Sequence, residues 1–73
     1  MSIFLQPVGV TKNYVDTQAM EVEGNFTIGE LLESLNLPAG INAIAIIDGK
    51  RMPGDEPLKD GAVVKIVSLV LGG

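Results

Sequence analysis

The sequence contains no cysteine and no histidine. Without cysteine there are no disulfides, no thiolate metal sites and no cysteine nucleophile, and without histidine the commonest general base and metal ligand are missing. The serines therefore have no imidazole to activate them. We expect a chain of 73 residues with this composition to be a carrier or binding module rather than an enzyme.

Aromatic residues and long apolar runs are also scarce. Only Phe4, Tyr14 and Phe26 are aromatic, so the core must be built from Ile, Leu, Val and Ala. No run approaches the ~20 apolar residues that span a bilayer, and the first residues lack the basic region of a signal peptide. These absences predict a cytoplasmic protein without membrane contact. The 47% of apolar residues indicates one small globular domain.

Positive charge is in short supply, because the net charge is −4. Phosphate backbones repel an acidic domain, so we predict no nucleic-acid binding and a basic partner surface instead. Four carboxylates lie near one another in the sequence: Asp48, Asp55, Glu56 and Asp60. Their spacing matches no metal-binding loop, so we interpret them as solvated surface that steers the chain toward a partner. We predict no metal site and no cofactor bound by this chain.

Two strands are predicted in the first third of the chain. Residues 2–8 are rich in β-branched and aromatic residues, and Pro7, which has no N–H, indicates that the strand ends there or borders an edge. Residues 9–13 predict a turn or loop. A second strand is expected within residues 14–23, where apolar and acidic residues alternate. The two strands would form a hairpin with a long loop.

The strongest local signal is a capping box, in which Thr27 precedes Glu30 by three residues. Phe26 and Leu31 are placed for the accompanying hydrophobic staple. An apolar stripe follows at helical spacing: Ile28, Leu31, Leu32 and Leu35. Residues 38–40 contain Pro and Gly and are expected to end a helix of about nine residues.

The rest of the chain predicts two or three strands. Residues 43–47 are a short apolar run that ends in the turn signal Asp48-Gly49. Residues 50–57 predict a loop, or a loop with a short edge strand. A last strand is expected from Ala62 to about Val67. The order predicts an α+β fold, a mixed four- to five-stranded sheet with one main helix packed across it.

Apolar residues occupy both faces of the last two long strands. If Ala45 and Val64 point toward the helix, alternation turns their neighbours to the opposite face. We therefore predict that Ile46 and Val67 form an exposed apolar patch, with Val63 on the same face, and that these three residues bind a partner. A one-residue change of register would reverse this assignment, and a loop or a second copy of the chain covering the patch is the alternative.

The predicted domain spans residues 1–67, and residues 68–73 form a tail that ends in Gly-Gly. Leu69 and Leu71 on an extended tail predict a groove on a partner. The alternative is that some of the apolar tail residues continue the last strand into the core. The final two residues, Gly72 and Gly73, lack Cβ atoms, so their backbone could thread a narrow channel.

Three segments resemble the ThiS/MoaD-type sulfur-carrier family, which has the ubiquitin-like β-grasp fold. They are Phe26–Leu32, Ile46–Gly49, and Leu58–Val64 followed by a strand and the terminal Gly-Gly. The resemblance covers essentially the whole chain. The sequence departs from the family at Ala62, where an acidic residue is usual.

The resemblance implies that the chain is the substrate of an enzyme rather than an enzyme itself. An E1-like adenylating enzyme of the ThiF/MoeB type would use ATP and Mg²⁺ to adenylate the Gly73 carboxylate. Sulfur from a persulfide would then yield a thiocarboxylate on Gly73, which donates sulfur to a synthase of thiamin or molybdopterin/tungstopterin biosynthesis. A modifier joined through Gly73 to lysines and a plain interaction domain remain as alternatives.

Overall fold

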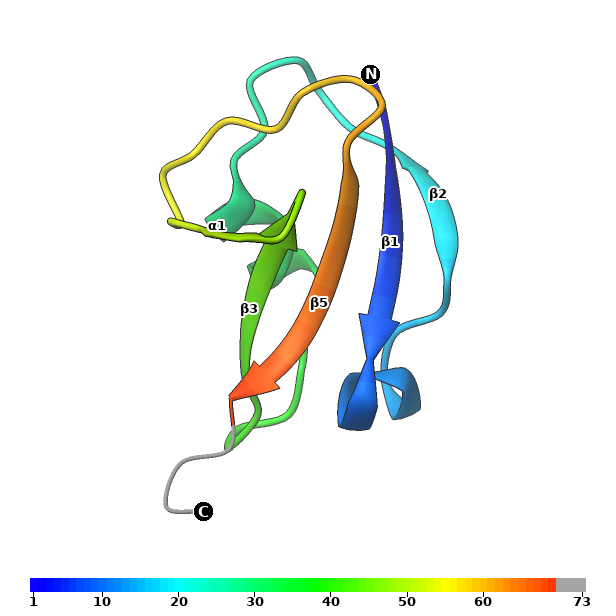
Figure 1. The fold of residues 1–73 in the computed structure, drawn as a ribbon, viewed down its shortest axis with the longest axis vertical. Helices are drawn as coiled ribbons and strands as arrows, with labels where there is room; N and C mark the ends of the chain where they lie inside the picture. Colours follow the sequence, from blue (N-terminus) through cyan, green and yellow to red (C-terminus); the bar gives the residue numbers. More distant parts are fainter. Residues whose placement is uncertain (70–73) are drawn as a thin grey trace.

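A mixed five-stranded sheet with one α-helix against it makes up the computed structural model, which describes residues 1–69 (Figure 1). The elements are β1 (Ser2–Val8), the 3₁₀ helix η1 (Gly9–Asn13), β2 (Gln18–Glu21), α1 (Ile28–Ser34), β3 (Asn42–Ile47), β4 (Lys50–Met52) and β5 (Val63–Leu69). The strand order is β2-β1-β5-β3-β4, in which β1 and β5 run parallel and the other neighbours antiparallel. The predicted α+β fold is confirmed.

Pro7 lies where β1 has a partner on one side only. Pairing with β2 covers Ser2–Leu5, whereas pairing with β5 covers Phe4–Val8. The N–H of Phe4 donates to Ala62 O on the β5 side at 2.9 Å, so alternation points the nitrogen of Pro7 to the other side, past the end of that pairing. Its missing N–H therefore removes no ladder hydrogen bond. The expectation that Pro7 borders an edge is confirmed.

The segment after β1, predicted as a turn or loop, is the 3₁₀ helix η1. Gly9 has φ 64°, which turns the chain back toward the sheet. Thr11 is completely buried, and its Oγ1 accepts from Val8 N–H at 3.0 Å and lies 2.7 Å from Ile66 O. This hydroxyl occupies a position between the ends of β1 and β5 and ties η1 to both strands.

The helix α1 begins as the capping box predicts. Thr27 Oγ1 accepts from Glu30 N–H at 3.2 Å, and the Glu30 carboxylate accepts from Thr27 N–H at 3.1 Å. The helix ends at Ser34, earlier than the predicted stop at residues 38–40. Asn36 has φ 51°, a left-handed conformation that Asn tolerates and that ends the helix before Pro38 is reached.

The predicted turn at Asp48-Gly49 joins β3 to β4. Ile47 pairs with Lys50, so the hairpin loop has only these two residues, and their φ angles are 52° and 79°. Positive φ at both positions is typical of the type I′ turn, whose twist matches that of the strands. β4 is the short edge strand that the sequence allowed within residues 50–57.

β5 runs two residues beyond the expected end at Val67. Ser68 pairs with Ala43, and Leu69 pairs with Asn42. Ser68 and Leu69, which the sequence assigned to the tail, therefore belong to the sheet, because β3 continues beside them. Residues 70–73 lie outside the described part of the chain.

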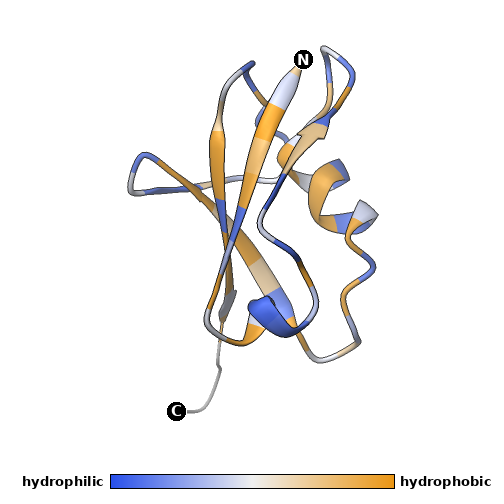
Figure 2. Ribbon diagram, turned by 90° about the vertical axis from the view of Figure 1, so that its right-hand side faces the viewer, coloured by the Kyte–Doolittle hydropathy of each residue, from blue (hydrophilic) through white to orange (hydrophobic). Residues whose placement is uncertain are grey.

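The core lies between the sheet and α1, and Figure 2 shows the helix on one side of the sheet. Its buried apolar residues are Ile3, Leu5, Val15, Ile28, Leu31, Ala45, Leu58, Val64 and Ile66. Leu32 and Leu35, the rest of the helical stripe, are half-buried and pack against this core. Burying one such aliphatic side chain stabilises the fold by about 1.5–3 kcal/mol, so the side of the sheet that faces α1 is firmly determined.

Candidate partner-binding face

The sheet face opposite α1 is built from every second residue of its strands. Leu5, Val64 and Ala45 are buried in the core, so the residues before and after each of them face outward. Cross-strand pairing arranges these outward residues in rows, which are Ala19–Phe4–Val63, Gln6–Lys65–Ile46–Arg51, Val8–Val67–Ile44 and Leu69–Asn42. We refer to these residues as the open face; it looks toward the viewer in Figure 1.

The structure places three predicted partner-binding residues on the open face. Val63 is 48% exposed, and Ile46 and Val67 are half-buried. Their orientation agrees with the predicted strand register, since Ala45 and Val64 are buried. Their role in partner binding stays a prediction.

The predicted residues at the C-terminal end divide into two groups. Leu69 is the last residue of β5, is 37% exposed and shares the outward side of the strand with Val67. The predicted groove-binding residue Leu71, the threading residue Gly72 and the adenylation site Gly73 lie outside the described residues.

The open face also contains apolar residues that the sequence argument missed. Phe4 is 45% exposed and pairs with Val63, Val8 is 39% exposed and pairs with Val67, and Ile44 is half-buried on the other side of Val67. Because Ile3 and Leu5 alternate with their neighbours along β1, the sequence did indicate that Phe4 and Val8 point to the face opposite these two residues. Their position beside β5 was not readable, because the parallel pairing joins segments about sixty residues apart.

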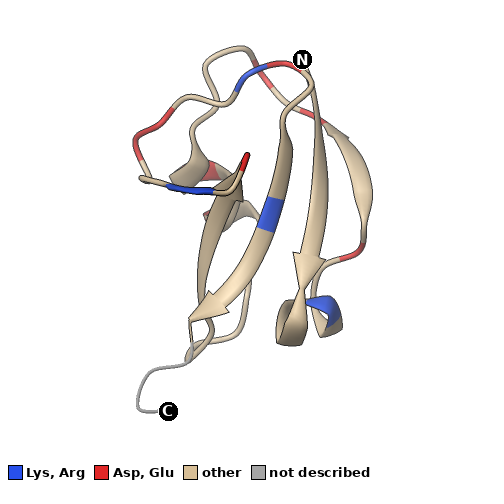
Figure 3. Ribbon diagram, viewed as in Figure 1, with Lys and Arg blue, Asp and Glu red and all other residues tan. Residues whose placement is uncertain are grey.

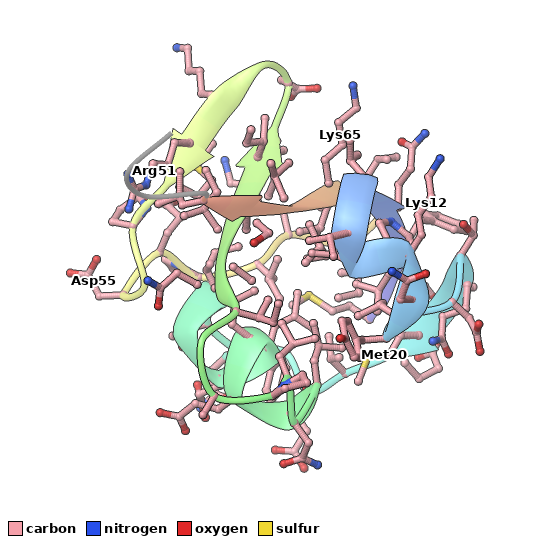
Figure 4. All side chains as sticks on the ribbon, turned by 90° about the horizontal axis from the view of Figure 1, so that it is seen from below. Lys12, Met20, Arg51, Asp55 and Lys65 are labelled. Carbon is pink, nitrogen blue, oxygen red and sulfur yellow. The ribbon has the colours of Figure 1, made fainter. Side chains whose placement is uncertain are left out.

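Two cations stand among these apolar side chains. Lys65 and Arg51 are the cross-strand neighbours of Ile46 on either side. Figure 4 shows Lys65 on the side of the sheet opposite α1. The acidic residues lie in loops, on α1 and on β2 (Figure 3). Glu21 is the one carboxylate in the described strands.

The charge of this face therefore differs from the net charge of the chain. A net charge of −4 favoured a basic partner, but the centre of the open face carries positive charge. The surface complementary to it is apolar and carries carboxylates.

The carboxylates that the sequence places close together lie near the start of β5, at the opposite end of this strand from Leu69. Asp48, Glu56 and Asp60 line a hollow of about 360 Å³ together with Lys59, while Asp55 does not line it. Within residues 1–69, no three acidic residues are grouped so that they could hold a metal ion. In the same part of the chain, the one α-helix is too short to cross a bilayer.

Similarity to one protein family extends over most of the sequence. The model of the ThiS family matches residues 5–73, nearly the whole length of the chain and both terminal glycines. The chain belongs to the ThiS family. No curated protein matches the sequence closely enough to be reported as a relative.

Solved structures with the same fold are ubiquitin-like β-grasp proteins. SAMP1 from Haloferax volcanii superposes with a TM-score of 0.78 at 16% identity, over 100% of both chains. A second structure of H. volcanii small archaeal modifier protein 1 gives 0.70 at 16% identity, over 94% of this chain and 98% of that one. The ubiquitin of Caldiarchaeum subterraneum gives 0.66 at 22% identity, over 100% and 98%.

Family and fold together describe a ubiquitin-like small modifier or sulfur carrier. Small proteins of this family are generally carriers without catalysis of their own. The absence of histidine and cysteine is consistent with this class.

Proposed function

We propose that this protein is a sulfur carrier whose C-terminal Gly73 is adenylated by an E1-like enzyme and converted to a thiocarboxylate. The observation that carries the proposal is the ThiS-family match, because it extends through residue 73 and so includes the terminal Gly-Gly. The exposed apolar and cationic open face supports it, because a carrier must dock on the enzyme that acts on its end.

The chemistry requires activation because a carboxylate is a poor electrophile. Transfer of AMP from ATP to the Gly73 carboxylate releases pyrophosphate and gives an acyl-adenylate with a good leaving group. The phosphates need Mg²⁺ and cationic groups around them, and this sequence has no phosphate-binding motif. The partner, an adenylating enzyme of the ThiF/MoeB type, must therefore supply that site.

Sulfur enters when the terminal sulfur of a persulfide attacks the acyl carbon. AMP leaves, and an acyl disulfide joins Gly73 to the donor. A second thiol then attacks the donor sulfur of that disulfide, which releases the thiocarboxylate and leaves an ordinary disulfide on the donor side. A synthase of thiamin or molybdopterin/tungstopterin biosynthesis accepts the sulfur.

Conjugation to proteins is the second candidate function. Two of the structural neighbours are structures of an archaeal small modifier protein. That likeness favours a modifier that ends in an isopeptide bond between Gly73 and a lysine. Both functions share the adenylation of Gly73 and differ only in the nucleophile that follows.

The decisive experiment follows the intact mass of the full chain. Incubation with a ThiF/MoeB-type enzyme, ATP and Mg²⁺ is expected to yield an AMP adduct of the chain. Addition of a persulfide donor is then expected to raise the mass of the unmodified chain by the difference between one sulfur and one oxygen atom. Removal of Gly73 should abolish both products, whereas Gly24→Ala, at a glycine with no heavy atom within 4 Å of an added Cβ, should not. Absence of any adduct on the unmodified chain would refute activation, and branched remnants on lysines without a thiocarboxylate would favour the modifier.

A further inference from the structure

The 3₁₀ helix η1 combines a buried polar residue with exposed apolar ones, the reverse of the usual arrangement. Thr11 is completely buried, whereas Val10 is 41% exposed and Val8, directly before η1, is 39% exposed. An exposed valine side chain buries little apolar surface and so contributes little to the stability of the fold, and a loop that faces solvent does not require valine.

Thr11 holds η1 in one place. Its hydroxyl oxygen lies 3.0 Å from Val8 N, 2.8 Å from Val8 O and 2.7 Å from Ile66 O. The backbone adds a second attachment, because Val15 N–H donates to Thr11 O at 2.9 Å and Val15 is buried in the core. The position of the exposed valines is therefore set by the sheet and does not depend on a partner.

The geometry of η1 turns its other residues away from the sheet. A 3₁₀ helix has three residues per turn, so when Thr11 faces inward, Val10 and Lys12 on either side of it face outward. Val8 pairs with Val67, which belongs to the open face. Along the chain, Val10 is thus separated from the open face by one glycine, and both valines are exposed.

The charges on this surface have one sign. Lys12 lies on η1, and Lys65 lies one row away from Val8 and Val67 on the open face. η1 also lies at the end of the sheet where β5 finishes at Leu69 (Figure 1). An enzyme that acts on the C-terminal end of the chain therefore approaches the end of the sheet at which η1 lies.

We infer that η1 is a rigid extension of the open face and that Val10 determines recognition by the activating enzyme. The inference rests on the proposed function and adds to it the chemistry of the partner, an adenylating enzyme with an apolar surface bordered by carboxylates. The apolar contacts of Val10 and Val8 stabilise the complex with the enzyme, while Lys12 and Lys65 orient the chain as the two proteins associate.

The test measures ATP–pyrophosphate exchange by the ThiF/MoeB-type enzyme with full-length variants of this chain. Val10→Ser is expected to raise KM about ten-fold and to leave kcat unchanged, because a side chain on η1 contributes to docking and not to the reacting carboxylate. Val10→Ile keeps the apolar contact and is the matched control, with a KM near that of the unmodified chain. Denaturant unfolding of each variant confirms that the fold is intact.

The outcomes separate this inference from the proposed function. If the unmodified chain supports exchange and Val10→Ser has an unchanged KM, the recognition role of η1 is wrong and the carrier function stands. A defect confined to the later transfer of sulfur to the synthase would also overturn it, since η1 would then contact the synthase. If the unmodified chain supports no exchange with such enzymes, the proposed function itself fails.

Discussion

The backbone N–H of Gly29 donates to the carbonyl oxygen of Gly54 at 2.8 Å. Gly29 is the second residue of α1, and Gly54 lies in the loop that follows β4. In the same way, Ile28 N–H donates to Glu56 O at 2.9 Å. The first N–H groups of a helix have no partner within it, and here a distant loop satisfies them. These contacts join the start of the helix to the loop that follows the edge strand β4.

We predict that Gly29→Ala destabilises the protein by about 1 kcal/mol, although alanine favours helix more than glycine does. A Cβ at this position would lie 3.0 Å from Gly54 O, so the loop must shift and its hydrogen bond must lengthen. Denaturant unfolding measures the change. Gly24→Ala, where a Cβ meets no heavy atom within 4 Å, is the matched control. Equal stabilities of the two variants would contradict the close approach.

Thr11→Val should lower the free energy of unfolding by about 1–3 kcal/mol. Valine has the shape of threonine but leaves Val8 N–H and Ile66 O without the hydroxyl between them. Thr17→Val, at an exposed threonine, is expected to change stability little. Amide hydrogen exchange at Val8 provides a second measurement, because its protection should fall in Thr11→Val alone. Unchanged protection would show that the hydroxyl does not hold η1.

Removal of the helix cap in Thr27→Ala is expected to cost about 1 kcal/mol. The alanine cannot accept the hydrogen bond from Glu30 N–H. Thr27→Ser keeps the hydroxyl and should retain most of the stability. Thermal unfolding of both variants is sufficient, and the prediction is wrong if serine and alanine lower the melting temperature equally.

The turn between β3 and β4 should tolerate only small or turn-forming residues. Gly49→Ala is expected to destabilise the fold by about 1–2 kcal/mol, because φ is 79° there and a Cβ is strained in that region. Asp48→Gly, at φ 52°, relieves the same strain and should leave stability equal or higher. Urea midpoints at a constant m-value compare the two. A neutral Gly49→Ala would argue against a type I′ turn.

Charge reversal should distinguish the open face from the hollow beside the start of β5. Lys65→Glu places a carboxylate in the centre of the open face, and we expect it to slow association with the activating enzyme about ten-fold at low salt. Lys59→Glu makes the same change of net charge beside the hollow and should have little effect. Stopped-flow association rates over a range of salt concentrations provide the measurement. Equal effects of both variants would mean that only net charge matters.

Local signals predicted the elements whose residues act on their near neighbours. The cap at Thr27 and Glu30 needs only three residues of separation, and the turn at Asp48-Gly49 needs two. The orientation of β3 and β5 also followed from alternation, since Ala45 and Val64 are buried as expected. Boundaries were less accurate, because the helix ends at Ser34, two residues before Asn36 adopts a left-handed conformation.

Contacts between distant segments were not readable in the same way. The threonine in residues 9–13 gave no sign that its hydroxyl would meet Ile66 O, and the segment was predicted as a loop. The extension of β5 through Leu69 depends on Asn42 lying beside it. The placement of Phe4 and Val8 beside Val63 and Val67 on the open face likewise depends on the parallel pairing with β5.

Composition, the capping box and the turn residues were enough to predict the α+β fold class, because helix starts and turns are properties of short stretches of chain. The C-terminal glycine was singled out only by the resemblance of the sequence to the sulfur-carrier family. The arrangement of the open face, with Val8 beside Val67 and Lys65 beside Ile46, arose only from folding. The favoured strand order and register are those that bury the apolar side chains of all strands at once, so they depend on the whole sheet and not on any single strand.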